Sequence, residues 1–207
     1  ILAEGAQGTL LDVDFGSYPF VTSSNTVSAA VCTGLGVAPN KTGRTYGVFK
    51  AYCTRVGSGP FPTELFDHSG EDLRDKGHEF GSTTGRPRRC GWLDLPALRY
   101  SIMINGVTDL IITKSDVMDD FDEITVCTQY KLGEQFLDYM PYEILDDQLE
   151  PVLEQHKGWN KDIVGITEIS QLPKELMEYV EYIEKAVDCP ITVISVGPDR
   201  TQTIIRE

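Results

Sequence analysis

The residues best suited to chemistry are three arginines in one glycine-bounded stretch, Gly81–Trp92, called the arginine loop below. Arg86, Arg88 and Arg89 fall within four residues and follow directly on two threonines and a glycine. A guanidinium fork binds a carboxylate or phosphate through two parallel hydrogen bonds, and glycines let the backbone approach such a ligand closely. An ordinary explanation is a solvated loop whose arginines pair with some of the 32 acidic residues. Because Pro87 stiffens the run and glycines bracket it, the pattern favours a positioned anion-binding loop.

A second pattern follows a compact apolar run, Asp109–Thr113, that predicts a buried strand. Lys114-Ser-Asp116 stands at its carboxyl end, where ligands bind in open α/β sheets. An aspartate there can accept hydrogen bonds from guanine N1–H and the exocyclic amine, while the lysine stem packs along the base. So short a motif matches often by chance, and its place after the strand is what makes Lys114 and Asp116 candidates for guanine recognition.

Three other patterns give weaker indications of function. Asp12 and Asp14 stand two residues apart beside turn residues, which is typical of caps and turns rather than of a catalytic pair. The hydroxyl cluster 21–26 precedes a predicted helix over 27–34, and capping of that helix is favoured over phosphate binding at the same end. The segment 36–42 imitates a phosphate-binding P-loop but lacks both required glycines, so that interpretation is rejected.

The sequence has no initiator methionine and opens on an apolar run, Ile1–Ala3, that predicts a short strand leading to a loop. Natural domains seldom begin this way, so we expect that an N-terminal portion has been removed and that an edge of the sheet is left uncovered. Gln7 lies at the tip of this strand with both donors and acceptors, as recognition of a base or amide requires. An ordinary loop glutamine has the same appearance.

Composition and charge limit the possible partners. With 207 residues, 41% hydrophobic and 24% charged, the sequence predicts one globular domain, or one domain with a subdomain. A net charge of -14 argues against broad binding to nucleic acid or to a membrane. No apolar run approaches the roughly 20 residues of a membrane span, and no signal peptide is expected. The five scattered cysteines and three histidines show no metal-ligand spacing, which favours free thiols in a reducing compartment.

The remaining patterns predict an α/β fold. The clearest helix runs over 174–187, with an apolar stripe of Leu176, Val180, Ile183 and Val187. A second helix over 95–105 is expected to be capped by Asp94. Further expected elements are strands over 46–54 and 190–195, a short helix over 70–76, a hairpin of 124–130 with 134–139, and an acidic connection over 146–154. We expect a largely parallel central sheet flanked by helices, with a small β-hairpin subdomain.

Six stretches then occur in an order that closely resembles the C-terminal half of the adenylosuccinate synthetase family. They are Glu4–Asp12, Val21–Asn25, Thr54–Glu64, the arginine loop, Thr113–Asp116 and Gly197–Thr201. The resemblance spans essentially all of residues 1–207, with 117–170 as a variable hairpin and connection that carries no functional motif. One departure is Pro87, which stands where the family often has another arginine, so a charge at that position is expected to be dispensable.

The resemblance implies an activity in purine synthesis. The family ligates inosine monophosphate (IMP) to L-aspartate and hydrolyses GTP with Mg²⁺. GTP phosphorylates the 6-oxygen of the base, and the amine of aspartate then displaces that phosphate. The resemblance also implies a homodimer in the cytoplasm.

By motif, the resemblance implies three sets of contacts. They are IMP contacts from Gln7, Thr22, Val56 and Arg86; an aspartate-binding loop of Ser82, Thr83, Thr84, Gly85, Arg86, Pro87 and Arg88; and GTP contacts from Arg88, Lys114, Ser115, Asp116, Ser195, Val196, Gly197 and Pro198. Within the loop, Thr84, Arg86 and Arg88 are expected to hold substrate carboxylates, and Arg88 also to reach the GTP ribose.

The family's phosphate loop, catalytic aspartate and histidine, and Mg²⁺ ligands belong to its N-terminal half. We therefore expect no catalytic residue and no metal ligand among residues 1–207, and no activity from these residues alone. An alternative is a guanine-nucleotide-binding module without catalysis, which the Lys114–Asp116 motif alone would permit. An RNA-binding protein that uses the arginines is disfavoured by the acidic charge and by the lack of aromatics interleaved with basic residues.

Overall fold

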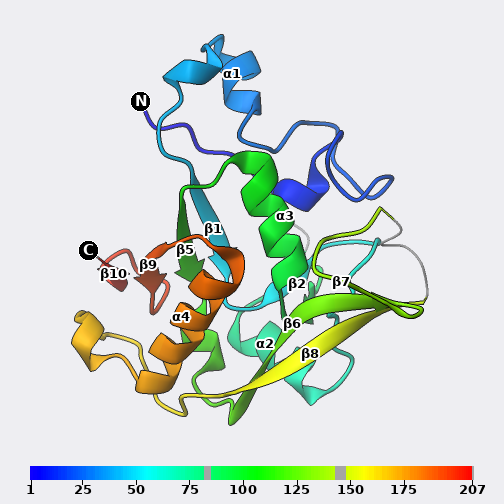
Figure 1. Cartoon of the computed structure of the whole chain (residues 1–207). Coiled ribbons are helices and arrows are strands. Elements are labelled where there is room, and N and C mark those ends of the chain that lie inside the picture. The colour runs from blue at the N-terminus through cyan, green and yellow to red at the C-terminus, as the bar shows by residue number, and fades with distance from the viewer. Residues whose placement is uncertain (82–84, 143–147, 207) are drawn as a thin grey trace.

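The centre of the molecule is a four-stranded sheet in the order β1-β5-β9-β10 (Figure 1). In this computed structural model, which describes residues 1–81, 85–142 and 148–206, the first three of these strands are parallel and β10 is antiparallel to β9. The strands span Tyr46–Lys50 (β1), Asp109–Thr113 (β5), Ile191–Ser195 (β9) and Thr203–Ile205 (β10). The predicted α/β class with a largely parallel sheet is confirmed.

Within the described ranges four α-helices accompany this sheet, and the two longest match their predictions. They span Ala30–Leu35 (α1), His68–Lys76 (α2), Leu95–Asn105 (α3) and Lys174–Val187 (α4). As expected, Asp94 caps α3 by accepting from the backbone N–H of Ala97 at 3.0 Å, and Gly106 ends the helix in the left-handed conformation that glycine adopts freely. Shorter 3-10 turns span Thr9–Leu11 (η1), Pro39–Lys41 (η2), Ser115–Met118 (η3) and Ile169–Gln171 (η4).

The apolar stripe of α4 lies in the main core. Leu176, Val180 and Ile183 are completely buried together with Ile112 of β5 and Ile194 of β9. Removal of this much apolar surface from water is the dominant favourable contribution to folding. The core thus fixes the central strands and, with them, the loops at their carboxyl ends.

A second sheet contains the predicted hairpin and two strands that were not predicted, Leu93–Asp94 (β4) and Leu149–Lys157 (β8). It pairs these strands with Glu123–Leu132 (β6) and Gln135–Leu137 (β7), and β7 and β8 are both antiparallel to β6. Two long ribbons, β6 and β8, lie side by side in Figure 1. The expected acidic connection over 146–154 is therefore wrong, because most of it is strand. The register sets Glu150 opposite Lys131, and cross-strand pairs of opposite charge favour such pairing.

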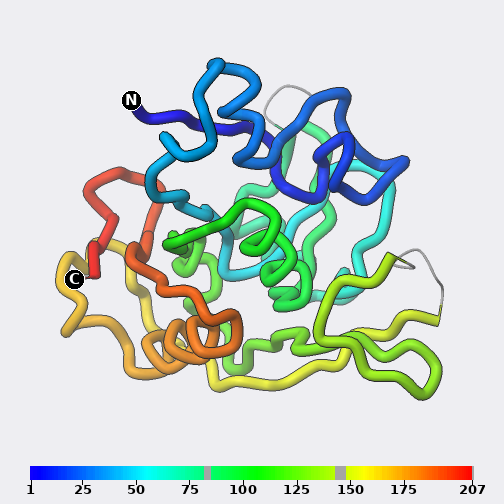
Figure 2. The backbone as a smooth tube through the Cα atoms, turned by 45° about the horizontal axis from the view of Figure 1, so that its top comes forward, coloured from blue at the N-terminus to red at the C-terminus, as the bar shows by residue number. Residues whose placement is uncertain are grey.

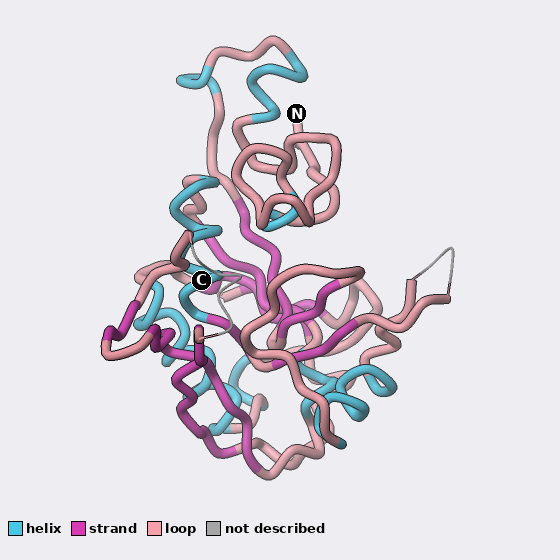
Figure 3. Tube along the Cα trace, turned by 90° about the vertical axis from the view of Figure 1, so that its right-hand side faces the viewer, coloured by secondary structure: helices cyan, strands magenta, loops and turns pink. Residues whose placement is uncertain are grey.

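The first 45 residues depart most from the predictions. Figure 3 shows them as loops and short helical turns at the top of the view, beyond the strands. Residues 1–3 form no strand, because no described strand pairs with them. The helix expected over 27–34 begins only at Ala30, and the hydroxyl cluster does not cap it. Instead Thr26 Oγ1 donates to the carbonyl of Gly8 at 2.7 Å, and Ser28 Oγ donates to that of Asn105 at 2.7 Å.

The strand expected over 46–54 divides at two buried residues, Ala51 and Tyr52. Its second part, Cys53–Arg55 (β2), leaves the central sheet and pairs antiparallel with Arg89–Gly91 (β3). Figure 2 shows the cyan and green segments of this region beneath the blue N-terminal segment. Because β2 follows β1 closely and pairs with β3, the end of the arginine loop lies near the carboxyl end of β1. None of the described helices is long and apolar enough to cross a membrane.

Candidate functional site

The expected guanine-reading residues lie at the carboxyl ends of two neighbouring strands. Strands β5 and β9 are parallel, with Ile112 opposite Ile194, so Lys114–Asp116 and Ser195–Pro198 leave the sheet at the same edge. This edge is where open α/β sheets bind ligands. The structure therefore brings together two segments that stand about eighty residues apart in the sequence.

The Lys-x-Asp segment has an unusual local conformation. Lys114 is in the left-handed region, with φ of 62°, and its Nζ donates to the carbonyl of Gly77 at 2.9 Å. Burial raises the pKa of the Asp116 carboxyl, against the lowering influence of a backbone N–H and of the Lys114 charge. Between them Ser115 is buried, and its Oγ has no hydrogen-bond partner among the described residues. The segment thus presents a cation and a half-buried carboxyl group at one strand end.

The turn after β9 is closed by its own hydrogen bonds. Ser195 Oγ donates to the carbonyl of Gly197 at 3.0 Å, and the N–H of Val196 donates to the carbonyl of Gln202 at 2.9 Å. Gly197 has the Gln202 side chain directly against its Cα, where a Cβ would collide with it. Backbone groups of 195–198 are therefore held at the sheet edge beside Lys114–Asp116.

The arginine loop closes on a short antiparallel stem. Arg88 N–H donates to the carbonyl of Glu79 at 2.9 Å, Phe80 and Pro87 form an isolated bridge, and Gly81 N–H donates to the carbonyl of Arg86 at 2.8 Å. At the tip, Gly85 has a φ of 63°. Of the expected aspartate-binding loop, Ser82, Thr83 and Thr84 lie outside the described residues, and Gly85 to Arg88 form one side of the stem.

The three arginines have different surroundings. Arg86 is exposed near the loop tip. Arg88 Nη1 donates to Glu79 Oε2 at 2.6 Å. Arg89 grips both carboxylate oxygens of Glu64 and donates to two loop carbonyls, those of Gly57 and Gly59, at 3.1 and 2.9 Å. Arg89 is thus a bracing residue for the 57–64 loop, whereas Arg88 stands at the base of the arginine loop.

Sequence reasoning missed the residue that holds Arg88. Glu79 is 1% exposed, and besides Arg88 it accepts from Lys50 Nζ at 2.7 Å and Tyr52 OH at 2.6 Å. Gly77 permits this packing, because a Cβ there would collide with the Tyr52 hydroxyl. A single glutamate between a histidine and a phenylalanine gives no sequence signal, since its partners come from 27 and 29 positions earlier.

The expected IMP contacts lie on the N-terminal segment and on the loop after β2. Gln7 has a φ of 69°, Thr22 Oγ1 bonds within its own turn to Ser24, and Val56 is half exposed. Arg55 links these two regions, since its Nη2 donates to Ser17 Oγ at 3.0 Å and to the carbonyl of Phe20 at 3.1 Å.

Asp12 organises the N-terminal segment. Its fully buried carboxylate accepts from the backbone N–H groups of Asp14, Phe15, Thr26 and Val27, at 2.9, 3.0, 2.5 and 3.1 Å. Burial alone would raise the pKa of Asp12, but the four backbone bonds together lower it to about 2. The expectation that Asp12 forms turns rather than a catalytic pair is in keeping with these contacts.

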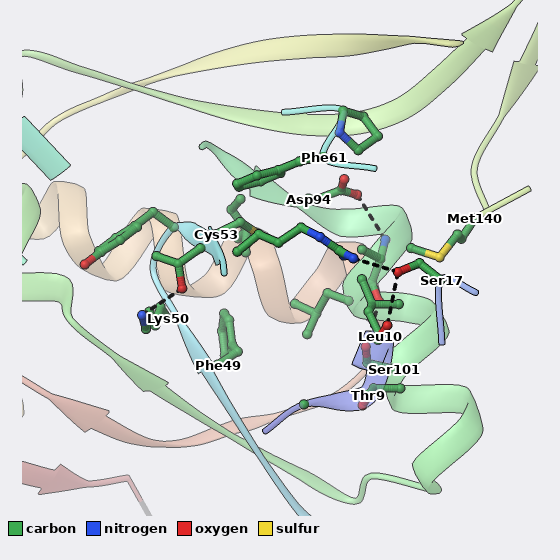
Figure 4. Close-up of a pocket in the computed structure, with 18 of the residues that line it drawn as sticks. Thr9, Leu10, Ser17, Phe49, Lys50, Cys53, Phe61, Asp94, Ser101 and Met140 are labelled. Carbon is green, nitrogen blue, oxygen red and sulfur yellow. Dashed lines mark hydrogen bonds between the residues drawn. The ribbon is translucent and has the colours of Figure 1, made fainter. Parts of the chain in front are cut away.

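A cavity of about 400 Å³ lies between the N-terminal segment, β1 and α3 (Figure 4). Thr9 and Leu10 line one side, Phe49 and Lys50 another, and Ser101 of α3 a third. The wall of the cavity is mostly apolar. Arg55 also lines the cavity and immediately precedes Val56, one of the expected IMP contacts. Across the described ranges, no cluster of three or more histidine, cysteine, aspartate or glutamate side chains is placed to hold a metal ion.

Comparison with known proteins gives consistent matches. A family model described as adenylosuccinate synthetase matches residues 1–204. Adenylosuccinate synthetases from Phocaeicola vulgatus and Bacteroides fragilis are 59% and 60% identical over 206 residues, which is all of this chain and 48% of theirs. A solved structure of fully ligated adenylosuccinate synthetase from Plasmodium falciparum has a TM-score of 0.95 at 44% identity, over 99% of this chain and 49% of that one.

A more distant structure shares the fold alone. The succinoaminodeoxyadenylate synthetase of cyanophage S-2L is 18% identical, with a TM-score of 0.58 over 97% of this chain and 45% of that one. The chain therefore spans about half the length of the relatives it matches.

Proposed function

Since this chain belongs to the adenylosuccinate synthetase family, we propose that the complete protein, of which it forms part, ligates IMP to L-aspartate and hydrolyses GTP. The observation that supports this most is that two predicted elements, one for binding an anion and one for binding a base, lie next to each other in the fold. Lys114 of the guanine-type strand end donates to Gly77, two residues before the base of the arginine loop. Both elements match the family in order along the chain.

On this proposal the chain's own residues bind and orient the three substrates. The Asp116 carboxylate accepts from guanine N1–H and the exocyclic amine, the stem of Lys114 packs along the base, and Ser195–Pro198 closes over it. Arg86 and Arg88 hold the carboxylates of aspartate on their guanidinium forks, together with Thr84. Gln7, Thr22, Val56 and Arg86 contact IMP.

This arrangement would set the order of bond changes. The γ-phosphoryl group of GTP moves to the 6-oxygen of the IMP base. The amine of aspartate then forms a C–N bond with carbon 6 of that base as phosphate leaves. Holding the aspartate carboxylates fixes the amine near the reacting carbon, which is catalysis by positioning. The family's Mg²⁺ ligands and acid–base groups belong to its N-terminal half, so the proposal assigns the metal and these groups to the remainder of the complete protein.

The proposal also includes a homodimer in the cytoplasm, supported by family membership alone. Light scattering of the complete protein at working concentration measures its oligomeric state, and a monomer under assay conditions would contradict the homodimer. Tagging of the complete protein in the source cell shows whether it lies in the cytoplasm.

Base choice gives the sharpest test of the guanine site. We expect Asp116→Asn in the complete protein to shift preference from GTP towards xanthosine triphosphate, because an amide presents a donor where guanine also donates. Competition kinetics with the two nucleotides measures the shift. Unchanged preference for GTP would remove Asp116 from this role.

The chain alone should form no adenylosuccinate at a measurable rate. Phosphoryl transfer depends on positioning and electrostatic stabilisation, and the family's phosphate loop and acid–base groups are not among residues 1–207. Mixing with a separately produced N-terminal half should restore turnover. Turnover by the chain alone, in a preparation free of host enzyme, would overturn this expectation. Guanine-selective binding without hydrolysis in the native protein would instead favour the non-catalytic module.

A further inference from the structure

Among the described residues, a buried carboxylate at the base of the arginine loop has only side-chain donors as partners. Both oxygens of Glu79 are used, with Lys50 and Tyr52 on Oε1 and Arg88 on Oε2, all within 2.7 Å. Glu79 and Tyr52 are each 1% exposed. A carboxylate so enclosed is stable only while its donors stay in place, because an unpaired buried charge is very unfavourable.

The donors come from two separate parts of the molecule. Lys50 is the last residue of β1 and Tyr52 follows two positions later, so one side of the cluster is rigid core. Arg88 belongs to the returning strand of the loop stem, where its N–H also donates to the carbonyl of Glu79 at 2.9 Å. Glu79 therefore joins the stem to the carboxyl end of β1 through side chains, while main-chain bonds fix the stem register.

Two cations share this one anion. Burial raises the pKa of Glu79, but Lys50, Tyr52 and Arg88 outweigh burial and lower it, so the carboxylate is ionised. Arg88 gives Glu79 one hydrogen bond through Nη1, and its buried Nε has no partner among the described residues. The guanidinium is thus held at one corner by Glu79, and the Arg88 side chain is 31% exposed, so part of it stays open to a ligand.

We propose that Glu79 is a positioning residue, which orients the Arg88 guanidinium for the carboxylate of the amino-acid substrate and anchors the loop to β1 through Lys50. This inference rests on the proposed function, in which Arg88 binds aspartate and IMP is bound by other residues. It follows that loss of Glu79 should weaken the binding of aspartate, and of GTP where Arg88 reaches its ribose, but not the binding of IMP. A general loss of fold would weaken all three substrates together.

The test uses steady-state kinetics of the complete protein. Glu79→Gln keeps the shape but removes the charge, and we expect the KM for aspartate to rise about ten- to hundred-fold, the size of a lost charge-assisted hydrogen bond. The KM for IMP should stay within about threefold of wild type. Glu79→Asp retains the charge on a shorter stem and should raise the aspartate KM only severalfold. An equal rise for IMP and aspartate would overturn the inference.

A double-mutant cycle separates action through Arg88 from an independent effect. If Glu79 acts through Arg88, adding Glu79→Gln to Arg88→Leu should produce little further rise in the aspartate KM. Additive effects would contradict the assignment. If Glu79→Gln fails to fold, Glu79→Asp replaces it in the double-mutant cycle. An unchanged aspartate KM in Glu79→Asp would then overturn the inference that Glu79 positions Arg88.

A matched control is available on α4. Glu184 is a partly buried carboxylate that accepts from Arg206 Nη1 at 2.7 Å and from the N–H of Ile191 at 2.6 Å, away from the arginine loop. Glu184→Gln should leave both KM values unchanged. If the wild-type complete protein forms no adenylosuccinate, the proposed function fails. If the wild type is active and Glu79→Gln keeps its aspartate KM, only the positioning role fails.

Discussion

Two loop regions of this chain are each organised by one buried carboxylate, and the partners of the two carboxylates are opposite in kind. In the N-terminal segment, Asp12 accepts from four backbone N–H groups. At the arginine loop, Glu79 accepts from three side chains, two of them cationic. The first arrangement fixes the path of the chain, whereas the second fixes the place of functional side chains.

The difference predicts different consequences of mutation. Backbone donors cannot move away when their acceptor is removed, so the loss of Asp12 leaves three part-buried N–H groups and one buried N–H group without this acceptor and lowers stability. Side chains such as Lys50 and Arg88 can rotate towards water, so the loss of Glu79 should change binding more than folding. The comparison therefore separates a stability defect from a kinetic one.

The largest effect is expected at Asp12. Asp12→Ala should lower the free energy of unfolding of the complete protein by about 3 kcal/mol or more, because each buried unsatisfied group costs about 1–3 kcal/mol. Urea denaturation measures the change. Asn25→Ala is the control: its side chain donates to Asp14 at 2.7 Å and to Asp12 at 3.3 Å on a more exposed side of the turn, and its loss should cost under about 1 kcal/mol. Equal losses would remove Asp12 from its organising role.

The acid dependence of stability sharpens this prediction. The pKa of Asp12 is lowered from 3.8 to about 2 in the folded state, so its contribution is present above pH 3.8 and is lost as the pH falls towards 2. The stability difference between wild type and Asp12→Ala should therefore shrink over that interval. A difference that stays constant between pH 5 and pH 2 would contradict the lowered pKa.

The next effect distinguishes two adjacent arginines. Arg88→Leu should raise the aspartate KM or lower turnover, at a cost of about 1.5–3 kcal/mol in transition-state binding, and Arg86→Leu should behave in the same way. Arg88→Lys should not restore full activity, because a point charge does not reproduce the fork. Arg89→Leu should be milder in kinetics, since Arg89 is committed to Glu64 and to the carbonyls of Gly57 and Gly59. Identical behaviour of all three would mean that the loop acts through general charge.

Local patterns predicted much of the fold. The helix Lys174–Val187 follows from its apolar stripe, and α3 follows from the capping Asp94 and the terminating Gly106. The buried strands β5 and β9 were apparent as short apolar runs, and their parallel pairing brought Lys114 beside the turn after β9 as expected of strand ends. Each of these signals lies within a few residues of the element it predicts.

The features that escaped prediction depend on distant partners. The acidic residues of β8 predict a connection and not a strand. The segment is a strand because β6 provides a long partner, with Lys131 opposite Glu150. Residues 1–3 read as a strand, yet no described strand lies beside them. The role of Glu79 depends on Lys50 and Tyr52, which only the folded chain brings near it. Tertiary context of this kind overrides local propensity.

The smallest effect is expected at the Tyr52 hydroxyl, and it is the most discriminating between stability and positioning. Tyr52→Phe removes one of the three donors of Glu79 but leaves Lys50 on the same oxygen, so the free energy of unfolding should fall by only about 1 kcal/mol. Because Glu79 then holds Arg88 less firmly, the aspartate KM should also rise, by about twofold. Tyr130→Phe is the matched control, since the Tyr130 hydroxyl donates at 2.7 Å to the buried carboxylate of Asp94, a residue that lies outside the arginine loop. It should lower stability by a similar amount and leave the aspartate KM unchanged. A rise in KM in both variants would show that stability loss alone impairs aspartate binding, and the distinction between the two buried carboxylates would then fail.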